Sequence, residues 1–147
     1  MVAVSLRDRG TRLCVYGQWI HQRFVRVSSE GTVCFSPDGN SLVSGGKDKS
    51  IRIWSTSAAL NVRTLRGHTD KVYCTSFSPN GNNVASGSAD GVRIWSLLTG
   101  ACEVFLTTHS GEVFAVSFSN DGSRLAWVRR IAQFEYGCYR RKLVFIL

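Results

Sequence analysis

The sequence predicts an all-β fold of consecutive four-stranded antiparallel sheets. Three observations support this prediction: short runs alternate apolar and polar residues, turn-forming residues separate the runs, and the whole pattern repeats. Phe35 precedes Phe77 by 42 residues, and Phe77 precedes Phe118 by 41. Period-2 alternation is typical of half-buried strands, and a fixed period of about 40 residues indicates stacked units of one supersecondary structure.

Residues 1–31 show no clear period, and we expect a leader or a degenerate unit there, with one or two strands. The best strand candidate is the alternating segment 23–27. A secretory signal is not expected, because charged residues begin at Arg7 and interrupt the apolar stretch that a signal needs. The longest apolar run, Leu143 to Leu147, is far shorter than the ~18 residues of a membrane helix. These features predict an intracellular protein, with the cytoplasm favoured and the nucleus left open.

The repeat region is expected to cover residues 32–126, and its first unit covers residues 32–65. The expected strands of this unit are Thr32–Phe35, two strands within residues 41–54, and Asn61–Leu65. A tight turn around Pro37 ends the first strand, because proline presets the turn and the Asp-Gly pair that follows tolerates a positive φ. The stretch from Asp48 to Trp54 is one residue longer than its counterpart in the next unit.

The second unit, residues 66–106, has the clearest pattern. Its expected strands are Val72–Phe77, Asn83–Ser88, Val92–Trp95 and Cys102–Leu106. Glycine- and asparagine-containing turns are expected between them, at residues 78–82, 89–91 and 98–100. Strict alternation places Val72, Cys74 and Ser76 on one face of the first strand. Tyr73, Thr75 and Phe77 are then expected on the opposite face.

The third unit, residues 107–126, is partial. Val113–Phe118 repeats the first strand and a turn follows, but the pattern stops at Trp127, where the other units carry serine and glycine. We expect residues 127–147 to form a basic tail outside the repeat. Our hypothesis is that this tail arises from an unspliced or frame-altered translation, which sequencing of the transcript tests.

The net charge of +8 is concentrated at the two ends of the chain. Residues 1–32 carry +3, residues 33–127 carry +1, and residues 128–147 carry +4. Basic patches attract nucleic acid and anionic lipid. In the tail, arginines at positions 129, 130, 140 and 141 alternate with aromatic residues that stack on bases in single-stranded nucleic-acid sites. A solvated tail without a ligand is the favoured interpretation, and nucleic-acid or anionic-lipid binding is the alternative.

The five cysteines do not predict a disulfide framework or a metal site. They are Cys14, Cys34, Cys74, Cys102 and Cys138, an odd number with no CxxC pair. Zinc sites and disulfide-rich domains use close or even spacing. We expect thiols within strands, such as Cys74 and Cys102, to serve as small apolar core residues. No cofactor and no metal are expected.

Several elements recur in order within residues 32–126, and two carry a family signature. The pairs Gly67-His68 and Ile94-Trp95 make this segment resemble the WD-repeat family, although Ser55 and Ser96 replace the aspartate that usually follows each tryptophan. The resemblance implies β-propeller blades. Propellers close with ~4–8 blades, so about two and a half units predict an incomplete propeller. We expect closure to need further blades from a longer chain or an oligomer, and we favour a fragment of a larger protein.

The resemblance also implies a buried structural tetrad in the second unit: His68, Ser86, Asp90 and Trp95. In this tetrad a hydrogen-bond chain runs from Trp95 through Ser86 and His68 to Asp90. Such a chain makes physical sense, since a desolvated imidazole and carboxylate must each be paired. The first unit keeps three members of the set, Ser44, Asp48 and Trp54. At the position expected for the histidine it has Arg26 or a neighbouring residue instead. The third unit keeps His109 alone.

An enzyme is not expected. A Ser-His-Asp triad requires an exposed nucleophile, and the GxSxG elbow is absent from the sequence. Gly45-Gly46-Lys47 and Gly87-Ser88 are not phosphate-binding loops, because no helix follows either one. His21 is interpreted as a surface residue. Catalysis would predict that Ser86→Ala abolishes activity without loss of folding, and a structural role predicts instead that His68→Ala loses about 1–3 kcal/mol of stability.

The predicted function is a non-catalytic scaffold for protein partners, by analogy with the family's fold. In that family one edge of the propeller is built from the loops before each first strand and the turns before each third strand. Six residues of these segments are candidate contacts, because mixed charge with an aromatic suits a polar-edged interface: Lys47, Lys49, Arg66, Asp70, Lys71 and Tyr73. The resemblance does not imply a particular partner.

Overall fold

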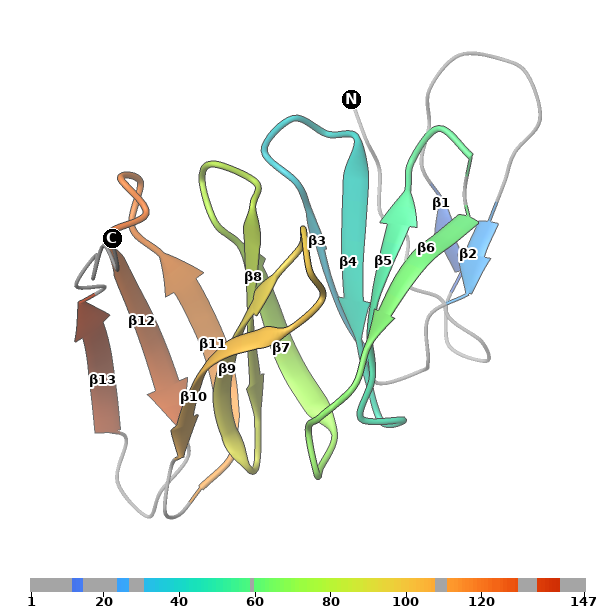
Figure 1. The fold of residues 1–147 in the computed structure, drawn as a ribbon. Helices are drawn as coiled ribbons and strands as arrows, with labels where there is room; N and C mark the ends of the chain where they lie inside the picture. Colours follow the sequence, from blue (N-terminus) through green and yellow to red (C-terminus); the bar gives the residue numbers. More distant parts are fainter. Residues whose placement is uncertain are drawn as a thin grey trace.

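The structure is a computed structural model that describes residues 12–14, 24–26, 31–58, 60–107, 111–129 and 135–140. These residues form strands and turns, and they include no helix able to cross a membrane. Most of the expected leader and basic tail lies outside the described residues, and so do His21 of the leader and His109 of the third unit. The prediction of an all-β fold of antiparallel sheets is confirmed, and the sheets form an open row (Figure 1).

Two four-stranded sheets form the centre of the row. The first contains β3 (Thr32–Phe35), β4 (Ser41–Gly45), β5 (Ile51–Ser55) and β6 (Leu60–Leu65), in that order. The second contains β7 (Val72–Phe77), β8 (Asn83–Ser88), β9 (Gly91–Ser96) and β10 (Cys102–Thr107). All neighbouring strands pair antiparallel. These bounds match the expected strands to within one or two residues, because local turn chemistry fixes each end.

Two smaller sheets come from the expected leader and from the partial third unit with the start of the tail. A two-stranded sheet pairs β1 (Arg12–Cys14) with β2 (Phe24–Arg26), within the expected leader. The third sheet of the row contains β11 (Val113–Phe118), β12 (Arg124–Arg129) and β13 (Glu135–Arg140). Strand β12 continues past Trp127, and β13 pairs with it along its whole length. No turn signature precedes β13, so the sequence pattern did not indicate this strand.

One turn design closes the first hairpin of each sheet in the row. A serine Oγ donates to the side-chain oxygen two residues later: Ser36 to Asp38 (2.5 Å), Ser78 to Asn80 (2.7 Å) and Ser119 to Asp121 (2.5 Å). The next residue is a glycine at a φ of 70–72°, which only glycine adopts readily. The serine hydroxyl and neighbouring donors lower the pKa of the Asp38 and Asp121 carboxyls. The repeated turn therefore sets the register of each hairpin.

The predicted faces of β7 are wrong at Val72. The pairing register shifts between Val72 and Cys74, so Tyr73 is an extra, bulged residue. A bulge interrupts strict alternation, and Val72 therefore packs in the same cluster as Phe77. Cys74 packs in a different cluster, on the other side of the sheet. Strand β11 has the same bulge at Phe114, between Val113 and Ala115.

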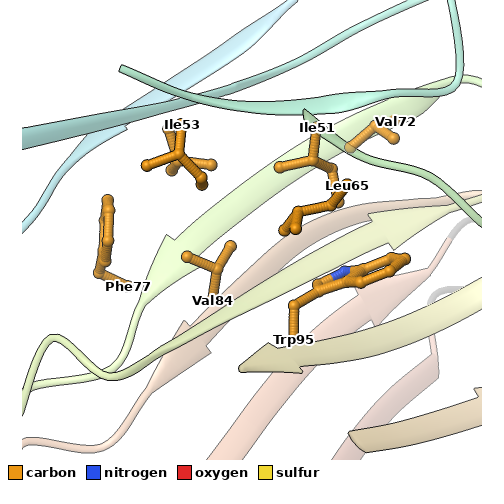
Figure 2. Packing of buried hydrophobic residues seen from close by; sticks show 8 residues of the cluster. Ile51, Ile53, Leu65, Val72, Phe77, Val84 and Trp95 are labelled. Atoms are coloured by element: carbon orange, nitrogen blue, oxygen red, sulfur yellow. The ribbon is translucent and has the colours of Figure 1, made fainter. Parts of the chain in front are cut away.

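The core between the first two sheets combines side chains from both (Figure 2). Ile51, Ile53 and Leu65 of the first sheet face Phe77, Val84 and Trp95 of the second. The Val72 amide donates to the Gly46 carbonyl across the interface at 3.0 Å. At the outer edge, the Arg63 guanidinium donates to the carbonyls of Leu97 and Leu98 at 2.9 and 3.1 Å. Apolar burial and these polar contacts fix the two sheets relative to each other.

The core between the second and third sheets contains Cys74, Ala85, Val92, Ile94, Val113 and Leu125. Burial raises the pKa of the Cys74 thiol to about 12, so it remains a neutral apolar group. The core prediction for Cys102 is wrong, because this residue lies exposed on β10 at the edge of its sheet. An edge strand has a solvent-facing side, and strand propensity alone does not distinguish it from an inner strand.

Candidate functional site

The candidate site lies at one end of the sheets, at the bottom of Figure 1, where three connections come together. They are the β4–β5 turn (residues 46–50), the β6–β7 loop (residues 66–71) and the β8–β9 turn (residues 89–90). We call these segments, with the first residues of β7 and β11, the loop edge. The β6–β7 loop is the connection between the first and second sheets.

A chain of three hydrogen bonds lies beneath the loop edge. Trp95 Nε1 donates to Ser86 Oγ at 2.8 Å. Ser86 Oγ and His68 Nε2 lie 2.6 Å apart, and His68 Nδ1 lies 2.5 Å from Asp90 Oδ1. The structure thus brings all four sequence-predicted residues together, in the order that the family resemblance implies. Strands β8 and β9 supply Ser86 and Trp95, the inter-sheet loop supplies His68, and the β8–β9 turn supplies Asp90.

The charges in this chain follow from burial. Desolvation lowers the pKa of His68, and the Asp90 carboxylate opposes this effect only in part. Desolvation also raises the pKa of Asp90, but hydrogen bonds from the Thr69 amide and from His68 outweigh it and leave the pKa below its usual value. His68 is therefore neutral and Asp90 ionised. With the proton on Nδ1, His68 donates to Asp90 and accepts from Ser86, and each polar hydrogen of the chain has an acceptor.

Asp90 has two further partners that the sequence did not indicate. The Thr69 amide donates to Asp90 Oδ2 at 2.9 Å, and Arg93 donates to the same oxygen at 3.2 Å. The Arg93 guanidinium also stacks on the Phe105 ring, 3.8 Å from its centroid. The only signal in the sequence is that an arginine follows the turn aspartate closely in both units. Arg93 lies three residues after Asp90, and Arg52 lies four residues after Asp48.

The first unit keeps a shorter version of the network. Trp54 Nε1 donates to Ser44 Oγ at 2.8 Å, which parallels Trp95 and Ser86. Asp48 instead accepts hydrogen bonds from Ser50 and Arg52 within its own sheet. In the third sheet Trp127 occupies the position of these serines. Arg26 belongs to β2, and nothing about its side chain is described.

The arrangement offers no accessible nucleophile. Ser86 is 0% exposed and His68 is 6% exposed, with both ring nitrogens and the serine oxygen engaged in hydrogen bonds. A hydrolytic triad needs a nucleophile that a substrate can reach. Within the described ranges, no cluster of three or more His, Cys, Asp or Glu residues could hold a metal ion.

The six candidate contact residues all lie on the loop edge. Lys47, Lys49, Arg66 and Asp70 are exposed, and Lys71 and Tyr73 are partly buried. Lys49 Nζ donates to the Thr69 carbonyl at 2.8 Å, so this lysine links the β4–β5 turn to the β6–β7 loop. Lys49 also adopts a φ of 65°, which accommodates the additional residue of the first unit. Lys71 Nζ lies 4.7 Å from the centroid of the Tyr73 ring.

Two further residues belong to the same surface and were missed. The Tyr73 hydroxyl donates to the Glu112 carboxylate, and its ring packs on Phe114 with centroids 5.0 Å apart. Phe114 is 43% exposed. It follows Tyr73 by 41 residues, and both are the bulged residues of their strands. The repeat period was the available signal, but it did not show that a bulge turns both rings toward the loop edge.

We predict that acid weakens the fold in a window set by His68. Its pKa is lowered from 6.5 on folding, so the unfolded chain binds a proton first as the pH falls. The full contribution of the neutral His68 to folding stability is present above pH 6.5. It decreases as the pH falls from 6.5 to the lowered pKa of His68 in the folded chain. Below 3.8, protonation of Asp90 removes a second contribution. Urea midpoints measured from pH 8 to pH 3 should fall in both windows.

His68→Gln is the control for this prediction, because it removes the titrating ring and leaves His21 and His109 in place. The variant should be less stable than the original chain at pH 8, and the difference should shrink as the pH falls below 6.5. A difference that stays constant across this window would contradict the assignment of a neutral, buried His68.

Comparisons with known proteins agree with the repeat pattern. The family model "WD domain, G-beta repeat" matches residues 23–55, 60–96 and 100–126. A 57-residue segment is 44% identical to WD repeat and SOCS box-containing protein 1 of Danio rerio, covering 37% of this chain and 14% of that protein. A 68-residue segment is 38% identical to nuclear distribution protein PAC1 of Arthroderma otae, covering 46% and 14%. A 42-residue segment is 45% identical to general transcriptional corepressor TUP1 of Saccharomyces cerevisiae, covering 29% and 6%. The chain thus spans 14% or less of the length of these relatives.

Proposed function

Because this chain belongs to the WD-repeat family, we propose that it is a non-catalytic scaffold that binds protein partners through its loop edge. One observation carries the proposal. The loop edge presents cationic, acidic and aromatic side chains side by side, and a buried hydrogen-bond chain holds the loop that bears them. Interfaces between proteins combine aromatic anchors with a polar surround.

The buried tetrad supports this function through structure. His68 and Asp90 connect the inter-sheet loop to the β8–β9 turn, and Ser86 and Trp95 connect both to the centre of the sheet. A loop held in one conformation before binding loses less conformational entropy when a partner docks. We therefore assign the tetrad a positioning role, with Lys49 and Thr69 as an additional link.

The three sheets are best interpreted as part of a larger propeller. A ring needs ~4–8 blades, and the row described here is open. The short share of each relative that the chain matches supports the same interpretation. We propose that the protein is intracellular. The thiols of Cys34, Cys74 and Cys102 are free, which agrees with a reducing compartment, where disulfides are rare.

A binding experiment tests the loop edge. The immobilised chain is mixed with proteins of its own cell type, and partners are identified by mass spectrometry. Charge reversal at Lys47 and Arg66, both exposed, should lower partner recovery by about tenfold. The matched control is Asn82→Glu, an exposed position on the hairpin turns at the opposite end of the sheets. Equal recovery with all variants would contradict the assignment.

Salt dependence separates this function from the alternative one. Binding to nucleic acid or anionic lipid through the basic ends should fall steeply between about 50 and 200 mM salt, because phosphate contacts release counterions. Recovery of a protein partner should fall less steeply with salt, because only a few exposed charges contribute. Ribonuclease and deoxyribonuclease treatment should leave it unchanged. A steep loss, insensitive to the loop-edge substitutions, would favour the basic ends.

A further inference from the structure

Charged side chains are distributed unevenly between the two ends of the sheets. The loop edge contains four basic residues: Lys47, Lys49, Arg66 and Lys71. The described connections at the opposite end contain no lysine or arginine: residues 36–40, 56–58, 78–82, 97–101 and 119–123. Their charged residues are Asp38 and Asp121. Because residues 33–127 carry a net charge of only +1, the loop edge is the basic end of a nearly neutral repeat region.

Most acidic groups at the loop edge are bound by the protein itself. The Asp90 side chain is only 11% exposed, and it accepts hydrogen bonds from the groups that surround it. Asp48 forms an ion pair with Arg52. The Glu112 carboxylate accepts the hydrogen bond of the Tyr73 hydroxyl. These carboxylates therefore contribute little to the charge that a partner meets.

The basic groups of the loop edge are directed to the surface. Lys47 and Arg66 are exposed, and Arg66 has no carboxylate partner among the residues that the structure describes. Lys49 Nζ donates to the carbonyl of Thr69, which is a neutral group and does not cancel the charge of the lysine. Asp70 is an exposed carboxylate on the same loop. The outer surface therefore has an excess of positive charge.

Contacts between the connections place this charge beside an exposed aromatic ring. The amide of the first residue of β7 donates to the Gly46 carbonyl at 3.0 Å, so Lys47 lies next to the start of β7. Lys71 Nζ lies 4.7 Å from the centroid of the Tyr73 ring, and Phe114 packs on the same ring. Phe114 is 43% exposed, which leaves part of its surface open to a partner. Positive charge and an apolar contact are thus neighbours on one surface.

We infer that the partner of the loop edge presents an acidic peptide segment. Its carboxylates face the basic residues of the loop edge, and an aromatic or large apolar side chain of the segment packs on Phe114. This inference rests on the proposed function and names the chemistry of the partner. Complementary charge speeds association and excludes partners of the wrong sign. Arg66 can also bind a carboxylate through two parallel hydrogen bonds.

The same surface is less suited to single-stranded nucleic acid. Such sites offer several aromatic faces, on which successive bases stack. Here Lys71 and Phe114 already lie against the Tyr73 ring, so Phe114 is the more accessible of the two rings. The carboxylates of Asp70 and Glu112 repel a continuous phosphate backbone. A peptide can place its acidic and apolar side chains at separate points and avoid them.

Selection from a displayed library of random peptides on the immobilised full chain tests the inference. Recovered peptides should carry a net negative charge and an aromatic or large apolar residue. The double variant with Lys47→Glu and Arg66→Glu reverses the charge at two exposed positions, so it should recover at least about tenfold fewer of them. Asn82→Glu adds a negative charge at the opposite end and should leave recovery unchanged. Phe114→Ala should remove the preference for the apolar residue and keep the preference for acidic ones.

The affinity of a selected peptide gives a second readout that needs no substitution in the protein. The peptide is labelled with a fluorophore, and its binding is followed by fluorescence anisotropy. Replacing its aspartates and glutamates by asparagines and glutamines keeps its shape and removes its charge. This change should weaken binding by at least about tenfold. Equal affinity of the two peptides overturns the inference.

The outcomes of the selection distinguish this inference from the proposed function. Neutral or basic peptides that still depend on Lys47 and Arg66 overturn the acidic partner and leave the proposed function standing. Peptides that bind all variants equally overturn both, because the loop edge is then not the binding surface. Failure to recover any peptide above an uncoated surface overturns the inference. So does a deoxythymidylate oligonucleotide that displaces the labelled peptide at lower concentration than the unlabelled peptide, which assigns the surface to nucleic acid.

Discussion

Trp95→Ala is expected to lower the free energy of unfolding by about 3–5 kcal/mol, the range for removal of a buried tryptophan. Trp95 is 2% exposed and packs between the first two sheets. It also donates a hydrogen bond to Ser86, so the substitution removes apolar contacts and a polar anchor together. Because domain stabilities are typically about 5–15 kcal/mol, this loss removes a substantial part of the total, and a chain at the lower end of that range would be largely unfolded at 37 °C. Circular dichroism and urea unfolding measure this loss.

Trp95→Phe separates the two contributions. It keeps most of the apolar volume and removes the Nε1 donor, so we expect a smaller loss of about 1–2 kcal/mol. In Ser86→Ala the indole N–H and His68 Nε2 both lose their buried partner. The double variant with Trp95→Phe and Ser86→Ala should lose less free energy of unfolding than the two single variants added together, because both substitutions remove the same Trp95–Ser86 hydrogen bond. Strict additivity would contradict a connected network.

Gly87→Ala is expected to destabilise the packing of the third sheet on the second by about 1–3 kcal/mol. The added Cβ would lie 2.5 Å from Cys74 Sγ and 2.6 Å from a Val113 methyl, so these side chains must move. Strand propensity acts in the opposite direction, since alanine is normally better tolerated in a strand than glycine. The sign of the effect therefore distinguishes steric exclusion from propensity. Hydrogen exchange of β11 and β12 amides should rise more than exchange of β4 amides.

Val128→Ala is the matched control for that prediction. Val128 pairs with Ala115 as Gly87 pairs with Cys74. Among the residues that the structure describes, no further sheet packs on β12 beyond the second sheet and β13, so alanine at Val128 should change stability by less than about 1 kcal/mol. A large loss at Val128 with little effect at Gly87 would contradict the packing described for the row.

The strands could be predicted because their ends depend on local chemistry. The turn at Ser78, Asn80 and Gly81 closes through contacts within a few residues of each other, so the sequence alone determines β7 and β8. The face of Val72 was predicted wrongly, since alternation assumes two residues per period and the bulge at Tyr73 adds one. Strand β13 forms by backbone pairing with β12 and carries no signature of its own.

The candidate site was predictable only where a repeated motif marked it. The positions of His68, Ser86, Asp90 and Trp95 came from a family pattern, and no propensity argument would have joined them. Contacts of Thr69 and Arg93 with Asp90 depend on the path of the loop, which the sequence does not encode locally. For Gly45 and Gly87 the sequence excluded a phosphate loop. It could not show their role, because the residues that need the space lie on the next sheet.

The family match at residues 60–96 begins on β6 and ends on β9. One sequence repeat therefore supplies the last strand of one sheet and the first three strands of the next. A version of the protein that ends at this repeat boundary, after Ser96, lacks β10. The backbone of β9 is then an unpaired sheet edge that can pair with other chains. A cut between the end of β10 at Thr107 and the start of β11 at Val113 would instead keep both four-stranded sheets whole. Expression trials of shortened versions should therefore favour ends that follow the sheets over ends that follow the repeats.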